Sequence, residues 1–338
     1  MTKIIGRRLL MLLLVLFCVS LGTFLMSNVM PGDPAQVMAG PHASQETVQS
    51  IRHQMGMDKP LPEQYWDYMV RLGHGDLGKS ITTQHPVSED LEQVFPATLE
   101  LIFYAFVVAL LVGIPLAVLA AVRPNSWFDR VASVLSLGGI SMPLFWLGLV
   151  LILVFYGKLG MLPSSGRLGA TMPPPPHITG LYTIDGVLTN YWGSWLDAVK
   201  HLVLPVLSLA YVQLAIVVRQ LRASMIDVLA LDYVRTARAA GLAPHTVIIR
   251  FGLRNALVPM LTVIGVAFGS LLGGAVVTET VFGWPGMGNY VVNAIATLDF
   301  PAIMGATLVI AVAYVLLNLL VDLINIYLNP VARYGGSS

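Results

Sequence analysis

Six stretches of the chain are apolar over the length that a helix needs to cross a lipid bilayer. About 20 residues, at about 1.5 Å each, span the roughly 30 Å of hydrocarbon in a membrane. The runs are residues 9–30, 101–122, 131–156, 202–218, 256–277 and 302–328. In lipid every backbone N–H and C=O must find a partner within the protein. The runs therefore predict α-helices, because none resembles the alternation of a β-barrel strand.

The composition agrees with a chain that folds in lipid. Hydrophobic residues make up 56% of the 338 residues, charged residues only 11%, and the mean hydropathy is +0.75. This apolar fraction exceeds what the core of a soluble protein needs. We therefore expect an all-α polytopic membrane protein with six transmembrane helices.

The basic residues predict which helix ends face the cytoplasm. An N-terminus on the inside places 12 of the 19 Lys and Arg residues there, including Arg123 and Arg130 in one short loop, as the positive-inside rule favours. An even number of spans returns the C-terminus to the cytoplasm. The first run has the basic start of a secretory signal, but it is too long and lacks a cleavage site, so we expect an uncleaved anchor.

The predicted organisation is an N-terminal helix, a long periplasmic segment, a five-helix core and a cytoplasmic tail. The corresponding ranges are residues 1–30, 31–96, 97–328 and 329–338. A connection of about 65 residues after the first span is unusually long, which predicts a small, partly helical cap. Prolines at residues 173–176 favour an extended spacer outside the packed core. Glycines and prolines around Trp284 predict tight turns that hold this side chain at the membrane interface.

Residues 219–255 form a predicted cytoplasmic loop that is rich in arginine. Six Arg residues lie between Arg219 and Arg254. Gly241 and Pro244 predict two short helices there instead of one long amphipathic helix. A plain linker needs positive charge for topology, but it does not need alternating basic and small apolar residues. We therefore expect this loop to dock onto another protein.

Three glycines, Gly265, Gly269 and Gly273, recur every four residues in the fifth run. Small residues at this spacing let helix backbones approach closely. The ridge predicts a contact with another helix, which belongs either to a partner chain or to this chain.

One motif resembles a nucleotide-binding loop but lacks its context. Residues 73–80 fit the pattern G-x-x-x-x-G-K-S, in which backbone amides cradle phosphates and the Lys, here Lys79, pairs with them. Such a loop follows a buried strand and opens a helix, whereas residues 65–72 are amphipathic and predict a helix. We therefore expect no cofactor on this chain.

No other constellation indicates an enzyme. The seven His residues are dispersed without a His-x-x-x-His pair, and the single cysteine, Cys18, lies in the first run. Neither a zinc site nor an intramolecular disulfide is therefore predicted. Weak metal handling by the outer histidines stays open as an alternative, since nickel and copper accept imidazole.

Several sequence blocks, in order along nearly the whole chain, carry a resemblance to a known family. They are residues 30–34 (MPGDP), 75–78 (GDLG), 97–100 (ATLE), 141–146 (SMPLFW), 232–241 (DYVRTARAAG), 253–256 (LRNA), 278–282 (TETVF), 284–286 (WPG) and 329–330 (NP). The chain resembles the inner-membrane permease subunits of bacterial ABC importers for dipeptides and oligopeptides, in particular their B-type subunits.

The resemblance implies a coupling helix that seats in a groove of an ATPase subunit. In the family a Glu-Ala-Ala motif followed by Gly forms this helix, and here Arg235 stands in place of the acid. The docking residues implied are Asp232, Tyr233, Arg235, Thr236, Ala237, Arg238 and Gly241.

The resemblance also implies the partners and the cargo. The expected partners are a second homologous permease chain, two cytoplasmic ATPases that use ATP and Mg²⁺, a periplasmic binding protein and membrane lipid, but no nucleic acid. The chain itself would be a non-catalytic subunit that moves peptides across the inner membrane. Nickel and glutathione importers share this scaffold and stay open as alternatives. A stand-alone secondary transporter is disfavoured, because internal repeats and charges near the middle of a span are lacking.

Overall fold

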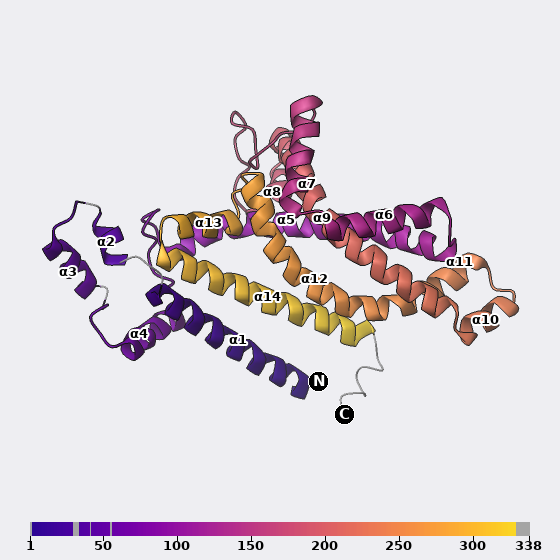
Figure 1. Cartoon of the computed structure of the whole chain (residues 1–338), viewed down its shortest axis with the longest axis horizontal. Helices are drawn as coiled ribbons and strands as arrows, with labels where there is room; N and C mark the ends of the chain where they lie inside the picture. Colours follow the sequence, from indigo (N-terminus) through magenta and orange to yellow (C-terminus); the bar gives the residue numbers. More distant parts are fainter. Residues whose placement is uncertain (1, 30–33, 41, 55, 329–338) are drawn as a thin grey trace. The chain divides into compact units, whose positions relative to one another are not determined.

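The computed structural model describes residues 2–29, 34–40, 42–54 and 56–328, and throughout these residues the regular structure is helical. The only β pairing among them is an isolated bridge between Lys79 and Pro86. The helices (Figure 1) are α1 (Thr2–Val29), α2 (Pro34–Ala39), α3 (Gln45–Gln54), α4 (Leu61–Gly73), α5 (Val87–Val122), α6 (Trp127–Ser141), α7 (Leu144–Leu151), η1 (Ile152–Lys158), α8 (Tyr182–Leu188), α9 (Trp192–Leu229), α10 (Asp232–Ala239), α11 (Pro244–Thr246), η2 (Val247–Leu253), α12 (Arg254–Val281), α13 (Met287–Ala296) and α14 (Phe300–Leu328). The expected all-α class is confirmed.

Four of the described helices are long and apolar enough to cross a membrane. They are α1, α5, α9 and α14, which correspond to four of the six predicted runs. The described part of α12 contains a shorter apolar stretch, Leu271–Val281. The chain is therefore a polytopic membrane protein.

The run over residues 131–156, which we expected to form one helix, is broken. It consists of α6 and of α7 continued by η1, and the axis bends by more than 40° between them. Pro143 precedes α7 with an extended backbone, ψ 133°. Proline also disfavours helical angles in the residue before it, which accounts for the end of α6 at Ser141.

The chain divides into two compact units. The first comprises Met1–Ala97 and Pro285–Val315, and the second comprises Thr98–Trp284 and Leu316–Ser338. The long helices α5 and α14 contribute residues to both units.

In the first unit, α4 packs on α1 through aromatic side chains. Phe24 and Tyr68 are buried, and their rings stack with centroids 6.1 Å apart. The hydroxyl groups of Tyr65 and Ser20 share a hydrogen bond of 2.9 Å, and Leu308 of α14 completes the cluster. The helix expected over residues 65–72 is confirmed as part of α4.

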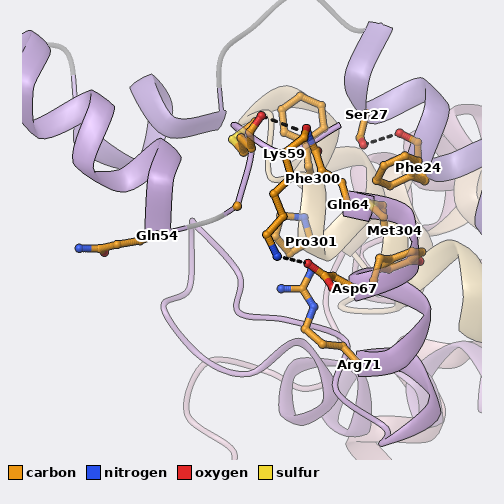
Figure 2. A pocket seen from close by; sticks show the side chains of 13 residues that line it. Phe24, Ser27, Gln54, Lys59, Gln64, Asp67, Arg71, Phe300, Pro301 and Met304 are labelled. Carbon is orange, nitrogen blue, oxygen red and sulfur yellow. Dashed lines mark hydrogen bonds and ion pairs between the residues drawn. The ribbon is translucent and has the colours of Figure 1, made fainter. Parts of the chain in front are cut away.

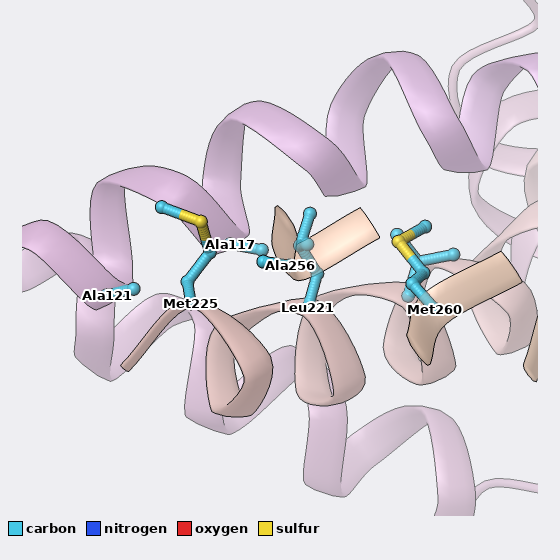
Figure 3. Close-up of a cluster of buried hydrophobic side chains, with 7 residues drawn as sticks. Ala117, Ala121, Leu221, Met225, Ala256 and Met260 are labelled. Carbon is cyan, nitrogen blue, oxygen red and sulfur yellow. The ribbon is translucent and has the colours of Figure 1, made fainter. Parts of the chain in front are cut away.

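In the second unit, α9 is the central helix and is mostly buried. It packs against α6, α7, α8 and α12. A cluster of small and flexible side chains joins it to α5 and α12 (Figure 3). Its buried members are Ala117, Ala121, Val217, Leu221, Met225, Ala256 and Met260. The end of α5, the second half of α9 and the start of α12 therefore lie together.

Gly113 lets α5 approach α9 closely, and a side chain there has no room. A Cβ atom at this position would lie 2.8 Å from Cγ1 of Val217, whose β-branched side chain is stiff. Gly113→Ala should therefore destabilise the protein by about 1–3 kcal/mol, as measured by thermal unfolding in detergent. The matched control is Gly193→Ala at the start of α9, where nothing lies within 4 Å. Equal stability of the two variants would contradict this prediction.

The segment between η1 and α9 is held by two carboxylates, of which Asp185 is buried and Asp197 half-buried. Asp185 accepts hydrogen bonds from the backbone N–H groups of residues 178–180 and from the Thr179 hydroxyl. Burial raises the pKa of Asp185, but these hydrogen bonds outweigh it and hold the pKa below its ordinary value. Asp197 accepts a further bond of 2.6 Å from the N–H of Gly169.

Arg167 and Glu100 form a buried ion pair in the same region. Nη2 of Arg167 lies 2.6 Å from Oε2 of Glu100, and the two side chains are 6% and 1% exposed. The guanidinium also donates to the carbonyl of Gly180 and covers the ring of Tyr182, 3.6 Å from its centroid. The hydroxyl and N–H of Thr183 donate to the other carboxylate oxygen. The buried charge of Glu100 is thus fully partnered.

The outer turn that contains Trp284 packs within the second unit. Trp284 is buried, and Arg167 lies 5.7 Å from its ring centroid. A backbone hydrogen bond from Gly166 to the carbonyl of Phe282 brings the two segments together. Of the four prolines at residues 173–176, only Pro175 is buried, and the other three are exposed outside regular structure.

Candidate functional site

The arginine-rich segment folds into short helices separated by a left-handed turn. Helix α10 ends at Ala239, and Gly241 adopts a φ of +75°. Pro244 begins α11, and proline suits this position because the N–H of the first helical residue has no acceptor within the helix. Glycine adopts this φ without strain. The predicted division at Gly241 and Pro244 is confirmed. Arg219 and Arg222 lie on α9, so the end of this helix forms the first part of residues 219–255.

One face of α10 anchors it to the rest of the unit. Val234 and Ala237 are buried against Val247 of η2. The hydroxyl of Tyr233 donates to the carbonyl of Phe251 at 3.2 Å, also in η2. Ala237, which we expected among the docking residues, thus faces inward in this chain.

Much of α10 and the turn after it is exposed. The exposed residues among the expected docking residues are Asp232, Tyr233, Arg235, Thr236, Arg238 and Gly241. Arg235 and Asp232 approach to 3.4 Å, but their side chains are 71% and 96% exposed, and such a pair adds little to stability. Nothing lies within 4 Å of a Cβ atom built on Gly241. Six of the seven expected docking residues are therefore exposed, and their role in docking stays a prediction.

A hollow of about 630 Å³ lies beside this surface. Its walls come from the ends of α5 and α9 and from the α11–η2 region, including Ala121, Ile226 and Leu242. Arg238 supplies the one charge among the lining residues described. An apolar hollow with a cationic rim can accept an apolar side chain from a partner.

Arg222 is engaged within the chain. Its Nε lies 2.6 Å from Oδ1 of Asp129 at the start of α6. Asp129 also accepts a hydrogen bond of 2.9 Å from the N–H of Asn125, and Ser126 caps α6. The pair fixes the short loop before α6 to the end of α9. The sequence analysis missed it, because the partners are 93 residues apart and no local pattern connects them.

The glycine ridge lies on α12. Gly273 is exposed, and no described atom lies within 4 Å of a Cβ built there. The neighbouring Gly274 makes the close contact within this chain, because a Cβ atom on it would lie 3.1 Å from the side chain of Leu209 of α9. The surroundings of Gly265 lie outside the described side chains, and Gly269 is half-buried.

The pattern at residues 73–80 has a different geometry from a phosphate loop. Helix α4 precedes it instead of a strand, and the next helix, α5, begins only at Val87. Ser80, whose hydroxyl would bind Mg²⁺ in such a loop, is 1% exposed and donates to Asp299 at 2.6 Å. The same carboxylate accepts from the N–H of Thr82. These contacts tie the loop to the turn before α14.

Comparison with known proteins gives matches along the chain. The family described as binding-protein-dependent transport system inner membrane component matches residues 113–334, and the N-terminal component of such systems matches residues 1–102. The probable D,D-dipeptide transport system permease protein of Escherichia coli K12 is 50% identical over 96% of each chain. The di/tripeptide transport system permease protein of Pseudomonas aeruginosa UCBPP-PA14 is 43% identical over 99% of each. The glutathione transport system permease protein of Escherichia coli O6:H1 is 38% identical over 99% of this chain and 100% of its own.

Proposed function

Because this chain belongs to the family of inner-membrane components of binding-protein-dependent transport systems, we propose that it is the permease subunit of an ATP-driven importer of di- and oligopeptides. The observation that carries the proposal is the full-length similarity to two peptide permeases. The exposed face of α10 supports it, because a permease without catalytic groups needs a surface for its ATPase. The chain would bind no cofactor, and ATP and Mg²⁺ would be used by two cytoplasmic ATPase subunits.

The docking segment is well placed to transmit movement. Two residues separate the end of α9 at Leu229 from the start of α10 at Asp232, and η2 continues without a gap into α12 at Arg254. Contacts between α10 and η2 make the segment one body. In the proposed mechanism, closure of the ATPase pair displaces α10, and α9 and α12 tilt with it. The pathway then opens alternately to either side of the membrane.

The proposed topology has six spans, with both termini in the cytoplasm and residues 31–96 in the periplasm. The packing of Ala121, Met225 and Ala256 in one cluster supports it. These residues mark the end of α5, the end of α9 and the start of α12, which are the three ends that the topology assigns to the cytoplasmic side. The exposed arginines near them, including Arg235 and Arg254, agree with the positive-inside rule.

The topology can be tested by thiol labelling in a Cys18→Ser background. Ser44→Cys, at an exposed position before α3, should react with a membrane-impermeant maleimide in intact spheroplasts. Ala240→Cys, exposed beside the docking surface, should react only after lysis. The reverse pattern would show that the orientation is inverted.

The remaining proposed partners are a second, homologous permease chain and a periplasmic binding protein. The open surroundings of Gly273 support a contact of the ridge formed by Gly265, Gly269 and Gly273 with the second permease. The segment of residues 31–96 would receive the binding protein.

The cargo can be tested by uptake in a host that lacks its own dipeptide importers. Cells expressing the complete transporter should take up labelled L,L- or D,D-dipeptides, and uptake should require the binding protein and intact ATPases. Glutathione is the second candidate, because a glutathione permease is 38% identical. Uptake of glutathione or nickel without any peptide uptake would contradict the peptide assignment.

A further inference from the structure

The ends of two membrane-spanning helices border a pocket of about 280 Å³ in the first unit (Figure 2). Its apolar lining includes Phe24 near the end of α1, Tyr68 of α4, and Phe300 and Met304 at the start of α14. Both α1 and α14 are candidate membrane spans. Since the last turns of one and the first turns of the other meet here, the pocket lies where both helices leave the bilayer.

The rim of the pocket carries one more positive charge than negative. Nζ of Lys59 lies 2.5 Å from Oδ2 of Asp67, so these two charges offset each other. Arg71 also lines the pocket, one turn beyond Asp67 on α4 (Figure 2). No ion pair involves Arg71 within the part of the chain that the structure describes. An uncompensated guanidinium at a pocket favours an anionic ligand.

Helix α4 also has the surface of a helix that lies at a membrane interface. Its Tyr65 and Tyr68 pack toward α1, whereas Trp66 and Val70 are 69% and 44% exposed. Trp is enriched at the headgroup level of membranes, where its ring contacts both apolar and polar groups. Exposed Trp and Val one turn apart therefore place α4 among lipid headgroups.

We propose that this pocket binds the phosphate headgroup of an anionic phospholipid, with Arg71 as the principal ligand. A guanidinium presents two parallel N–H donors, which match two phosphate oxygens. The glycerol backbone would lie on Phe24 and Met304, and the acyl chains beside Leu25 and Met26, which are exposed on α1. Free phosphate or a peptide carboxylate offers the same charge but would leave this apolar surface uncovered. The site goes beyond the proposed transport function and does not depend on the cargo.

Photo-crosslinking in the assembled transporter tests the site. The complex is placed in nanodiscs that contain phosphatidylcholine and a small fraction of photoactivatable phosphatidylglycerol, and adducts on peptides from α1 and α4 are quantified by mass spectrometry. Arg71→Ala should lower these adducts about fivefold, since one basic residue near an anionic membrane surface contributes a free energy of that order. Arg71→Lys should give an intermediate yield of adducts, because lysine keeps the positive charge but lacks the two parallel N–H donors of the guanidinium.

The control is Lys79→Ala, which removes an exposed cation from the same unit outside the pocket and should leave the yield unchanged. If Arg71→Ala prevents assembly, Lys59→Gln replaces it, because it leaves Asp67 unpaired at the rim and should also lower the yield. Undiminished adducts in the pocket variants would refute the proposal. Loss of adducts on addition of inorganic phosphate or Ala-Ala would instead assign the pocket to a soluble anion.

Discussion

Replacing Gly241 with Trp should reduce peptide uptake at least about tenfold while the chain still inserts into the membrane. The φ of +75° at this position strains any residue with a Cβ atom by about 1–2 kcal/mol, a factor of about 5 to 30 in an equilibrium. An indole meets nothing within this chain, because the space around Gly241 is open. The indole should therefore clash with the partner protein that docks against α10.

The measurement combines peptide uptake by cells with ATPase stimulation by loaded binding protein in proteoliposomes. Gly160→Trp is the matched control, since Gly160 has a φ of +61°, has nothing within 4 Å and lies outside the docking surface. It carries the same backbone strain and should retain uptake. Wild-type uptake by Gly241→Trp at normal protein levels would contradict the proposal that α10 docks onto the ATPase. Equal impairment of both variants would show that strain alone is responsible.

Replacing Arg167 with Met should cause the largest loss of stability, about 3–5 kcal/mol, because it leaves the carboxylate of Glu100 buried without a counter-charge. The side chain of Glu100 is 1% exposed, so water cannot take the place of the guanidinium. The double variant Arg167→Met with Glu100→Gln should recover much of the loss, since a neutral amide is far easier to bury.

Thermal unfolding of the purified chain in detergent measures both variants. Arg235→Met is the control, because the ion pair of Arg235 with Asp232 is exposed and is expected to contribute less than about 1 kcal/mol. A melting temperature of Arg167→Met within error of this control would contradict the prediction that the ion pair with Arg167 is needed to keep Glu100 buried.

The helices were predictable because their causes are local. Apolar length alone identified the runs that became α1, α5, α9 and α14, and the interrupting residues Gly241 and Pro244 gave the division after α10. The length of α9 was underestimated, because polar residues also belong to the helix: Lys200 is exposed on it, and Arg222 pairs with Asp129.

The buried ion pairs could not be predicted, because their causes are distant in sequence. Glu100 stands just before the apolar run over residues 101–122, and only the fold brings Arg167 to it, 67 residues later. The same arginine lies 5.7 Å from the ring centroid of the buried Trp284. Of the expected docking residues, all but Ala237 are exposed, and the inward position of Ala237 follows from contacts with η2 that no spacing reveals.

The break between α6 and α7 has a consequence for what surrounds the chain. Where a helix is interrupted within a span, carbonyl groups of its last turn lose their intrahelical donors. Hydrocarbon offers no replacement, so irregular backbone at membrane depth persists only against protein or water. Met142 and Pro143 are nevertheless exposed in the isolated chain. In the proposed six-span topology, lipid tails therefore cannot cover the backbone at this break, and water or another polypeptide must contact it when the transporter works.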